Sequence, residues 1–413
     1  ISTIIVEREK SRSFKSLSRP FIDMRTFVLF FAEAIGARII FADQPLRIDT
    51  RFRYEQGEFD EFTRTRLRAG SAADQVVIDM RSGKRKGVEE EPEQNDRRKF
   101  ATLSTDLMAL LTEAEKRDEH SFLFNVRRGI APNTICEDCG STVMCHVCDA
   151  PTVLHKSQDG NVFVCHKCGS FRSAKERCLH CNSWKLKPLG IGVERIRAEL
   201  EKAFPNRGIF MVDSDNTKTY KEALGAVEKF YKTPGGILVG TEMVLPYLLK
   251  SVPYTAVVSV DSLLSLPDPR VHERVFYLLL QIQEKATGTF LLQTRQPELP
   301  LIEHVLHGNL RDFYRTEIEG RKKFKYPLFT ALIKITAVGT RLRAAEEIEK
   351  LESYFSEYGF HIYPSFVPVT KGKYSLNGLI RVPRDIWPDK KLVAMLRSLP
   401  PHIMVQVDPE STL

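Results

Sequence analysis

The chain has 413 residues, more than a single hydrophobic core usually serves, so we expect two to four domains. Apolar residues make up 42% of it, and Glu33 and Arg38 interrupt the most apolar run, so a membrane-spanning helix is not expected. The net charge of +8 permits a polyanionic partner but does not require one.

The first residues, ISTIIVEREK, begin without Met and lack the organisation of a signal peptide, so we expect the true start of the chain to be missing. Two β-prone runs, STIIVE and ARIIFAD, lie within residues 1–50 and predict the last part of an α/β unit. Further along, SGKRKGVEEEPEQNDRRK is highly charged and nearly free of apolar residues. It predicts a linker or a disordered loop over 82–100.

All eight cysteines of the chain lie between residues 136 and 181, where they form four C-x-x-C pairs. Disulfides are the alternative, but one short segment of a large chain without a signal peptide favours zinc. Each pair supplies two sulfurs to one ion, so four pairs predict two tetrahedral zinc sites. Because four sulfurs leave no open coordination position, we expect both ions to be structural.

The spacers between the pairs predict which of them share an ion. Two β-prone runs, TVLH and NVFV, flank a turn at Asp159-Gly160, and a hairpin between two such pairs is the pattern of a zinc ribbon. One ion is therefore expected on Cys145, Cys148, Cys165 and Cys168. The enclosing ion is then expected on Cys136, Cys139, Cys178 and Cys181.

Other side chains near the cysteines allow alternative roles. Four histidines could each replace a sulfur, but the complete cysteine count disfavours them as ligands: His146, His155, His166 and His180. Trp184 follows the last pair, and we expect its ring to pack against the zinc module; stacking on a nucleic-acid base is the alternative.

Strands and helices alternate around the cysteine segment. The buried run HSFLFN precedes the segment. Helices are expected at 193–204, 217–231, 241–250, 270–283 and 298–314, and strands at 207–215, 235–240, 254–260 and 288–294. This alternation predicts a parallel sheet covered on both faces, with the cysteine segment inserted between its first strand and first helix.

The C-terminal part has a different order of elements. Strands on FTALIKITAV, HIYPSFVPV, SLNGLIRV and HIMVQVD, with helices on AAEEIEKLESYF and DKKLVAMLRSL, predict a β-α-β-β-α-β, ferredoxin-like sandwich over about 326–413. From residue 321 onward, basic residues outnumber acidic ones by six. Within the run RKKFK, we take Lys322, Lys323 and Lys325 as candidate phosphate ligands, with a solvated surface as the alternative.

Several longer motifs resemble the PriA family of bacterial replication-restart proteins. The matching stretches are the cysteine pairs, VRRGIAP, PLGIGVER, VDSDNT, ILVGTEM, LPDPRVHERVFYLLLQ, LLQTRQPELPL, KYPLF and VDPESTL, in unbroken order. The family's proteins are superfamily 2 helicases, in which two RecA-like lobes hydrolyse ATP and move 3′ to 5′ along DNA. The resemblance also implies two nested zinc ions and a chain that corresponds to the family's C-terminal two thirds.

The resemblance implies an α/β fold class: a RecA-like parallel-sheet lobe with a two-zinc insertion, a partial first lobe and a C-terminal α+β domain. The expected boundaries are 1–60 for the remnant of the first lobe, 61–118 for a connector that holds the charged linker 82–100, 119–134 plus 190–320 for the second lobe, 135–189 for the zinc insertion and 321–413 for the C-terminal DNA-binding-type domain. Partners implied by the family are forked or single-stranded DNA, primosome proteins and single-stranded DNA-binding protein, in the cytoplasm and without a membrane.

The resemblance adds two pairs of candidate nucleic-acid contacts. Arg127 and Arg128 lie in VRRGIAP and suit phosphate contacts, with a surface salt bridge as the alternative. Gly240 and Thr241 match the second-lobe motif ILVGTEM, which touches nucleic acid or transmits the nucleotide state.

The chain departs from the family where ATP and Mg²⁺ are used. The family's Mg²⁺ box D-E-E-H is here Glu7, Arg8, Glu9 and Lys10, its G-S-A-T-P-S is FADQPL, and its Q-V-A-G-R-A-G-R is QIQEKATG, which offers only Lys285. No G-x-x-x-x-G-K-[ST] loop occurs, as expected if the start of the first lobe is missing. Phosphoryl transfer needs these groups, so we expect no ATP hydrolysis by this chain and assign no catalytic residue beyond a degenerate Mg²⁺ box at Glu7 and Glu9.

Two hypotheses of function remain open at this point. The first is a PriA-like replication-restart protein with the family's helicase activity. The second is an ATPase-inactive, zinc-stabilised platform for DNA or primosome proteins. A generic zinc-ribbon protein is a third reading, but it explains only the cysteines.

Overall fold

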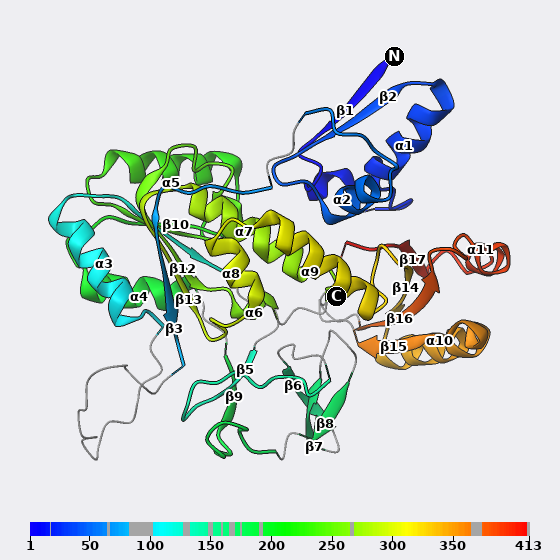
Figure 1. The fold of residues 1–413 in the computed structure, drawn as a ribbon. Helices are drawn as coiled ribbons and strands as arrows, with labels where there is room; N and C mark the ends of the chain where they lie inside the picture. Colours follow the sequence, from blue (N-terminus) through cyan, green and yellow to red (C-terminus); the bar gives the residue numbers. More distant parts are fainter. Residues whose placement is uncertain are drawn as a thin grey trace. The chain divides into compact units, whose positions relative to one another are not determined.

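The computed structural model describes residues 1–16, 18–63, 67–81, 102–126, 133–147, 152–157, 160–164, 170–173, 176–189, 193–264, 268–364 and 374–410 (Figure 1). The chain divides into two compact units. Unit 1 contains Ile1–Leu67, Pro267–Glu273 and Leu310–Leu413, and unit 2 contains Arg68–Leu266 and Arg274–Asn309. None of the helices in these described ranges combines the length and the apolarity that crossing a membrane requires.

A six-stranded parallel sheet forms the centre of unit 2, in the order β10-β11-β4-β12-β13-β3. Its strands are β3 (Asp74–Asp79), β4 (Ser121–Asn125), β10 (Ile209–Val212), β11 (Ile237–Gly240), β12 (Val252–Ser259) and β13 (Ala286–Thr294). The central strands β4 and β11 are buried along their whole length, as expected for a parallel sheet covered on both faces. The predicted α/β class with a parallel sheet is therefore confirmed.

Helices follow the strands of this sheet and supply its core. They are α3 (Thr105–Lys116), α4 (Val193–Ala203), α5 (Tyr220–Lys232), α6 (Asp261–Leu264), α7 (Val271–Glu284) and α8 (Pro300–Leu306), with a 3-10 turn η2 (Glu242–Val244) after β11. Leu107 of α3 and Ile196 of α4 pack in one cluster with Leu123 of β4 and Val239 of β11. Apolar side chains that recur at helical spacing predicted α4, α5 and α7, whereas α3 was not predicted. The helix expected at 241–250 is only the 3-10 turn η2, and the helix expected at 298–314 ends as α8 at Leu306, with a separate helix beginning at Leu310.

Part of the stretch expected as a connector, 61–118, belongs to this sheet. Strand β3 pairs in parallel with β13, Asp74 opposite Thr289 and Asp79 opposite Thr294, and α3 contributes to the core. The strand is an edge strand of only six residues, so its weak alternation did not identify it in the sequence. The charged linker predicted at 82–100 lies outside the described residues.

The cysteine segment forms its own small sheets in unit 2. Strands β5 (Asn133–Cys136) and β9 (Leu186–Leu189) pair where the segment begins and ends. Between them, β6 (Val153–Ser157) and β7 (Gly160–Val164) form an antiparallel hairpin to which β8 (Phe171–Ser173) adds a third strand. The hairpin predicted from TVLH and NVFV is therefore confirmed.

The N-terminal part of unit 1 is a small β-α-β arrangement. Strands β1 (Thr3–Glu7) and β2 (Arg38–Ala42) pair in parallel, and α1 (Met24–Ile35) connects them after a 3-10 turn η1 (Arg12–Phe14). Asp23 caps the start of α1, and Gly36 ends it with φ of 66°, a left-handed conformation that glycine adopts at low cost. Helix α2 (Ile48–Glu55) follows. Both strands expected in residues 1–50 are present.

The C-terminal part of unit 1 is a four-stranded antiparallel sheet in the order β15-β16-β14-β17. After α9 (Leu310–Lys323), its elements are β14 (Thr330–Gly339), α10 (Arg341–Tyr354), η3 (Ser356–Tyr358), β15 (His361–Pro364), β16 (Tyr374–Pro383), α11 (Lys390–Arg397) and β17 (Met404–Val407). A Cβ atom at Gly378 would lie 1.8 Å from the ring of Phe360, so only glycine fits there. The predicted β-α-β-β-α-β order is confirmed.

Candidate functional site

Four cysteine sulfurs come together in the insertion. The Sγ atoms of Cys136, Cys139, Cys178 and Cys181 all lie within 4.8 Å of one another. The Cys136–Cys181 and Cys139–Cys178 distances are both 3.5 Å. A tetrahedral ion with metal–sulfur bonds of about 2.3 Å needs sulfurs about 3.8 Å apart. The cluster can therefore hold one metal ion.

The two C-x-x-C turns of this cluster have the same backbone design. The N–H of Gly140 donates to the carbonyl of Cys136 at 2.8 Å, and the N–H of Asn182 donates to the carbonyl of Cys178 at 2.8 Å. Gly140 and Asn182 both have positive φ, 73° and 58°, and both are residue types that tolerate this conformation. Each turn is thus closed by the chain's own hydrogen bonds, with both sulfurs on one side.

The strand pair β5–β9 brings the two turns together. Cys136, the last residue of β5, is paired with Leu186, the first residue of β9. This strand pairing explains why the first and the last C-x-x-C pairs, which are far apart in sequence, come together. These two pairs were expected to form the enclosing site. Cys136 and Cys178 are buried, whereas Cys181 is exposed, so one side of the cluster faces solvent.

The inner set of cysteines is only partly described. Cys145 is buried, and its Sγ lies 3.0 Å from the hydroxyl of Ser170. Cys148, Cys165 and Cys168 lie outside the described residues, so the second expected site stays a prediction.

The structure also shows where the histidines and the tryptophan near the cysteine cluster lie. His146 and His180 are exposed and stand outside the four-cysteine cluster. The expectation that Trp184 packs against the module is wrong: 73% of its surface is exposed.

The candidate nucleic-acid residues Gly240 and Thr241 form the turn from β11 into η2. A Cβ at Gly240 would lie 3.0 Å from the side chain of Val244 and 3.1 Å from the carbonyl oxygen of Val212, so a side chain there would require its neighbours to shift. The buried hydroxyl of Thr241 accepts a hydrogen bond from the N–H of Met243 at 3.4 Å and caps η2. Both residues have a structural role, and a contact with nucleic acid stays a prediction.

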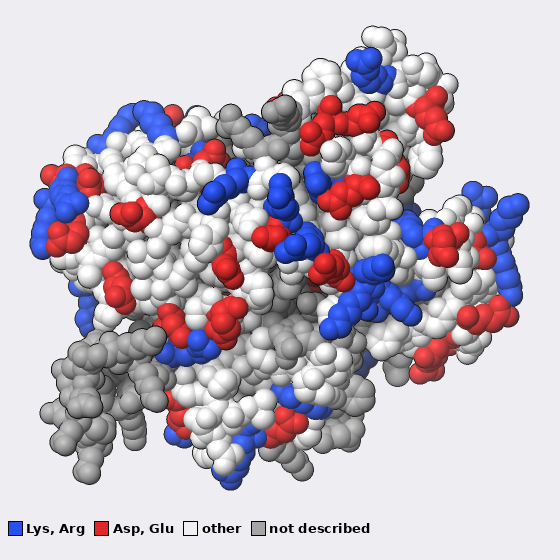
Figure 2. Space-filling model, viewed as in Figure 1, with Lys and Arg blue, Asp and Glu red and all other residues white. Residues whose placement is uncertain are grey.

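The basic run after 320 divides into a buried and an exposed part. Lys322, Lys323 and Lys325 are exposed at and just beyond the end of α9, and Figure 2 shows basic side chains gathered in this region. Arg321, from the same run, is buried with 1% of its side chain exposed. Arg127 and Arg128 lie outside the described residues.

The two acids of the degenerate Mg²⁺ box are in different environments. Glu7 is exposed at the end of β1, whereas Glu9 is 1% exposed. The Glu9 carboxylate accepts hydrogen bonds from the Thr50 hydroxyl at 2.5 Å and from the Arg47 N–H at 2.6 Å. Burial raises the pKa of Glu9 to about 7, against the effect of these hydrogen bonds. Lys10, beside it, pairs with Asp43 at 3.1 Å.

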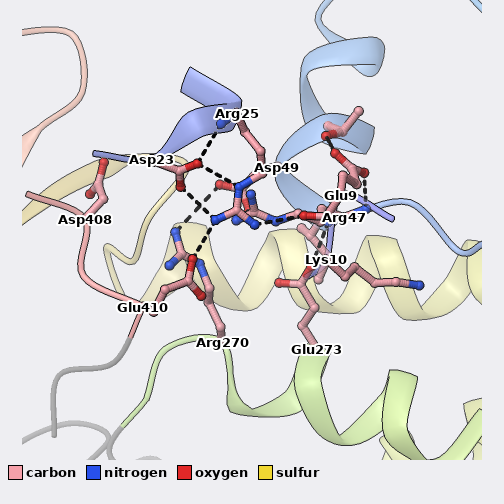
Figure 3. A network of polar contacts seen from close by, with 12 residues as sticks. Glu9, Lys10, Asp23, Arg25, Arg47, Asp49, Arg270, Glu273, Asp408 and Glu410 are labelled. Atoms are coloured by element: carbon pink, nitrogen blue, oxygen red, sulfur yellow. Dashed lines mark hydrogen bonds and ion pairs between the residues drawn. The ribbon is translucent and has the colours of Figure 1, made fainter. Parts of the chain in front are cut away.

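Glu9 lies beside a buried ionic network within unit 1, drawn in Figure 3. The guanidinium of Arg25 donates to the carbonyl of Glu9 at 2.8 Å, to the carboxylate of Asp23 at 2.8 Å and to that of Glu410 at 2.7 Å. The side chain of Arg270 lies 3.9 Å from Asp49. Its guanidinium donates to the carbonyl of Pro409 at 3.3 Å.

Arg321 forms a second centre of the network. It donates to Glu273 at 2.7 Å and to Glu317 at 3.2 Å, and it lies 3.6 Å from Asp49. Burial opposes its charge, but these three carboxylates outweigh burial and raise the pKa of Arg321. Burial also opposes the charge of Asp49, but Arg47, Arg270 and Arg321 outweigh it and lower the pKa of Asp49.

Sequence reasoning missed this network. Its members come from the N-terminal part, the start of α7, α9 and the residues after β17, and no fixed spacing connects them. The local signals were an arginine, Arg25, within the otherwise apolar start of α1 and the charged residues of VDPESTL. Neither signal specifies a partner.

The sequence of the chain is similar to those of several curated proteins that share one name. No protein-family model matches the chain. Replication restart protein PriA of Borreliella burgdorferi is 24% identical over 377 residues, 88% of this chain and 54% of that protein. The protein of the same name from Bacillus subtilis is 24% identical over 422 residues, 99% of this chain and 50% of that protein. The one from Chlamydia muridarum is 33% identical over 229 residues, 54% of this chain and 30% of that protein.

The chain spans about half the length of the curated relatives it matches most fully, not the two thirds expected. The match to the Bacillus subtilis protein nevertheless runs over nearly all of this chain, from the N-terminal part to the C-terminal sandwich. The resemblance predicted from the motifs is therefore confirmed, and the chain is a relative of replication restart protein PriA.

Proposed function

We propose that this chain is a zinc-containing, DNA-binding protein of replication restart and primosome assembly. The observation that carries the proposal is the similarity to replication restart protein PriA over 99% of the chain, together with a four-cysteine cluster inside the matched region. The proposed partners are forked or single-stranded DNA. Primosome proteins and single-stranded DNA-binding protein are proposed from the family resemblance.

We propose zinc as the metal of the cluster. Four thiolates in a tetrahedral arrangement select zinc or an iron–sulfur centre, and paired C-x-x-C turns around a β-hairpin favour zinc. With four sulfur ligands the ion has no open position, so its role is to hold the insertion in shape. A second ion on Cys145, Cys148, Cys165 and Cys168 completes the proposal.

The DNA-binding part of the proposal is tested with a labelled fork and its matching duplex. Fluorescence anisotropy is measured over a range of salt concentrations, in parallel with elemental analysis of the same preparation. We expect two zinc ions per chain, binding to the fork, and an affinity that falls with salt as counterions are released. Absence of fork binding at low salt by the zinc-loaded chain would contradict the proposal.

A second candidate function is a binding platform that does not hydrolyse ATP. The environment of Glu9 favours it, because a carboxylate that holds Mg²⁺ needs access to the ion and to the phosphates. The carboxyl of Glu9 is instead enclosed by Thr50 and the N–H of Arg47, with a pKa near 7. The guanidinium of Arg25 donates to the Glu9 carbonyl.

ATP turnover with and without forked DNA separates the two candidates. For the platform we expect no turnover above that of a Glu9→Gln control prepared in the same way. Turnover near 1 s⁻¹, within the ordinary range for enzymes, that is lost in Lys285→Ala would support the helicase reading instead. Fork binding by Lys285→Ala checks that the variant is folded.

A further inference from the structure

Two tyrosines meet at the edge of the parallel sheet of unit 2, outside the cysteine cluster and the ionic network. Tyr220 is the first residue of α5, which follows β10, and Tyr247 lies shortly after η2, which follows β11. Strands β10 and β11 are parallel neighbours, so the segments that follow them emerge at the same edge. The ring centroids lie 5.2 Å apart, with the ring planes at 56°.

The pair presents aromatic surface to solvent. Tyr220 is 70% exposed, Tyr247 is half-buried, and Leu249 nearby in sequence is 78% exposed. Burial of an aromatic ring against another flat apolar surface is favourable, so an exposed pair is suited to a flat apolar partner.

Both segments are held in place by hydrogen bonds. The Thr219 hydroxyl accepts from the N–H of Glu222, and the Glu222 carboxylate accepts in return from the N–H of Thr219, which closes a capping box at the start of α5. The hydroxyl of Tyr231 donates to the carbonyl of Lys250 at 2.6 Å and anchors the segment after Tyr247. A surface already ordered before binding loses little conformational entropy when a ligand arrives.

Three exposed lysines accompany the pair: Lys218, Lys221 and Lys250. The ammonium of Lys250 lies over the ring of Tyr231, 5.7 Å from its centroid, and the charge of Lys218 acts on Glu222. The nearby acids have other partners, since Glu222 accepts from backbone N–H groups and Glu242 pairs with Arg274 at 2.7 Å. All three side chains are exposed, so a polyanion can reach their charges.

We propose that Tyr220 and Tyr247 form a stacking site for an unpaired base of single-stranded DNA, with the three lysines on the adjacent phosphates. Aromatic rings beside cations are the arrangement with which proteins bind single strands regardless of sequence, because every base has a flat face. The inference deepens the proposed function and rests on DNA binding. It adds a contact for the unpaired strand near Thr241, the residue that caps η2.

The affinity of the full chain for a labelled oligothymidylate tests the site. Tyr220→Ala is expected to lower that affinity by about 5- to 150-fold, the loss typical of one stacked base, and Tyr220→Phe to retain it. The slope of log affinity against log salt should be unchanged in Tyr220→Ala. Lys218→Ala and Lys221→Ala should each reduce the steepness of this slope by about 0.7, because each variant loses one contact between a lysine and a phosphate.

Two controls accompany the measurement. Tyr354→Ala removes a 46% exposed tyrosine from α10 and should leave the affinity for the single strand unchanged. A blunt duplex has no unpaired base, so Tyr220→Ala should bind it like the parent chain. Circular dichroism and zinc content establish that each variant is folded.

Three outcomes overturn the inference. If Tyr220→Ala and Tyr247→Ala both bind the single strand as tightly as the parent chain does, there is no stacking site. The proposed function is then still supported as long as the parent chain binds the fork. An equal loss on single strand and duplex also removes it, because stacking requires an unpaired base. Failure of the parent chain to bind either the single strand or the fork removes the site and the proposed function together.

Discussion

The carboxyl group of Glu9 offers a quantitative test of the buried N-terminal environment. Burial raises its pKa from 4.5 to about 7 in the folded chain. Between these values the unfolded chain has lost the proton and the folded chain still holds it. The stability that comes from the neutral carboxyl is therefore fully present below about pH 4.5 and is lost as the pH rises through 7.

The size of the effect follows from the pKa difference. A difference of about 2.5 corresponds to about 3 kcal/mol of unfolding free energy, as an order of magnitude. Glu9→Gln keeps the shape of the protonated side chain and cannot ionise. The variant should therefore be more stable than the parent above pH 7, by up to about 3 kcal/mol, and the two should converge toward pH 4.5.

Urea denaturation at several pH values between about 5 and 8, with the metal-loaded chain, measures this difference. Glu7→Gln is the matched control, since Glu7 is two residues away and exposed, and it should leave the pH dependence as it is in the parent. If Glu9→Gln instead loses more stability at the upper end of this range than at the lower end, Glu9 is a charged member of the network and its pKa is not raised. A difference that stays constant at every pH would equally contradict the raised pKa.

Three further perturbations probe the other features. Cys178→Ser should lower the zinc content from two ions to one and expose the insertion to limited proteolysis, since structural zinc stabilises such modules by roughly 10 to 16 kcal/mol; two ions retained would contradict the enclosing site. The triple change of Lys322, Lys323 and Lys325 to Ala should flatten the salt dependence of fork binding by up to about two, whereas an unchanged slope identifies a solvated surface. Arg321→Met should lower the unfolding free energy by about 3 to 5 kcal/mol in urea, because it leaves buried carboxylates without their cation; a stability equal to the parent's would mean that the network is not needed for folding.

Local patterns in the sequence determined most of the secondary structure. The apolar spacing of LESYF and its neighbours marked α10, and the alternating run HIMVQVD marked β17, because the hydrogen bonds and the buried side of an element recur at a fixed period. Cysteine spacing likewise determined that Cys136 acts with Cys139, since a C-x-x-C turn closes on itself. The hairpin predicted between Cys148 and Cys165 assigned those two pairs to one ion and left Cys178 and Cys181 to join Cys136 and Cys139, as the cluster shows.

Only the tertiary structure decided which charges are buried and which face solvent. Arg321 and Lys322 are adjacent in a basic run, yet one is enclosed by Glu273 and Glu317 and the other is exposed. Arg25 meets Glu410 although the two lie at opposite ends of the chain. Glu317 lies four residues before Arg321 on the same helix, but Glu273 and Asp49 come from other elements. A buried charge needs such partners to offset its lost hydration, and no local period in the sequence predicts those from other elements.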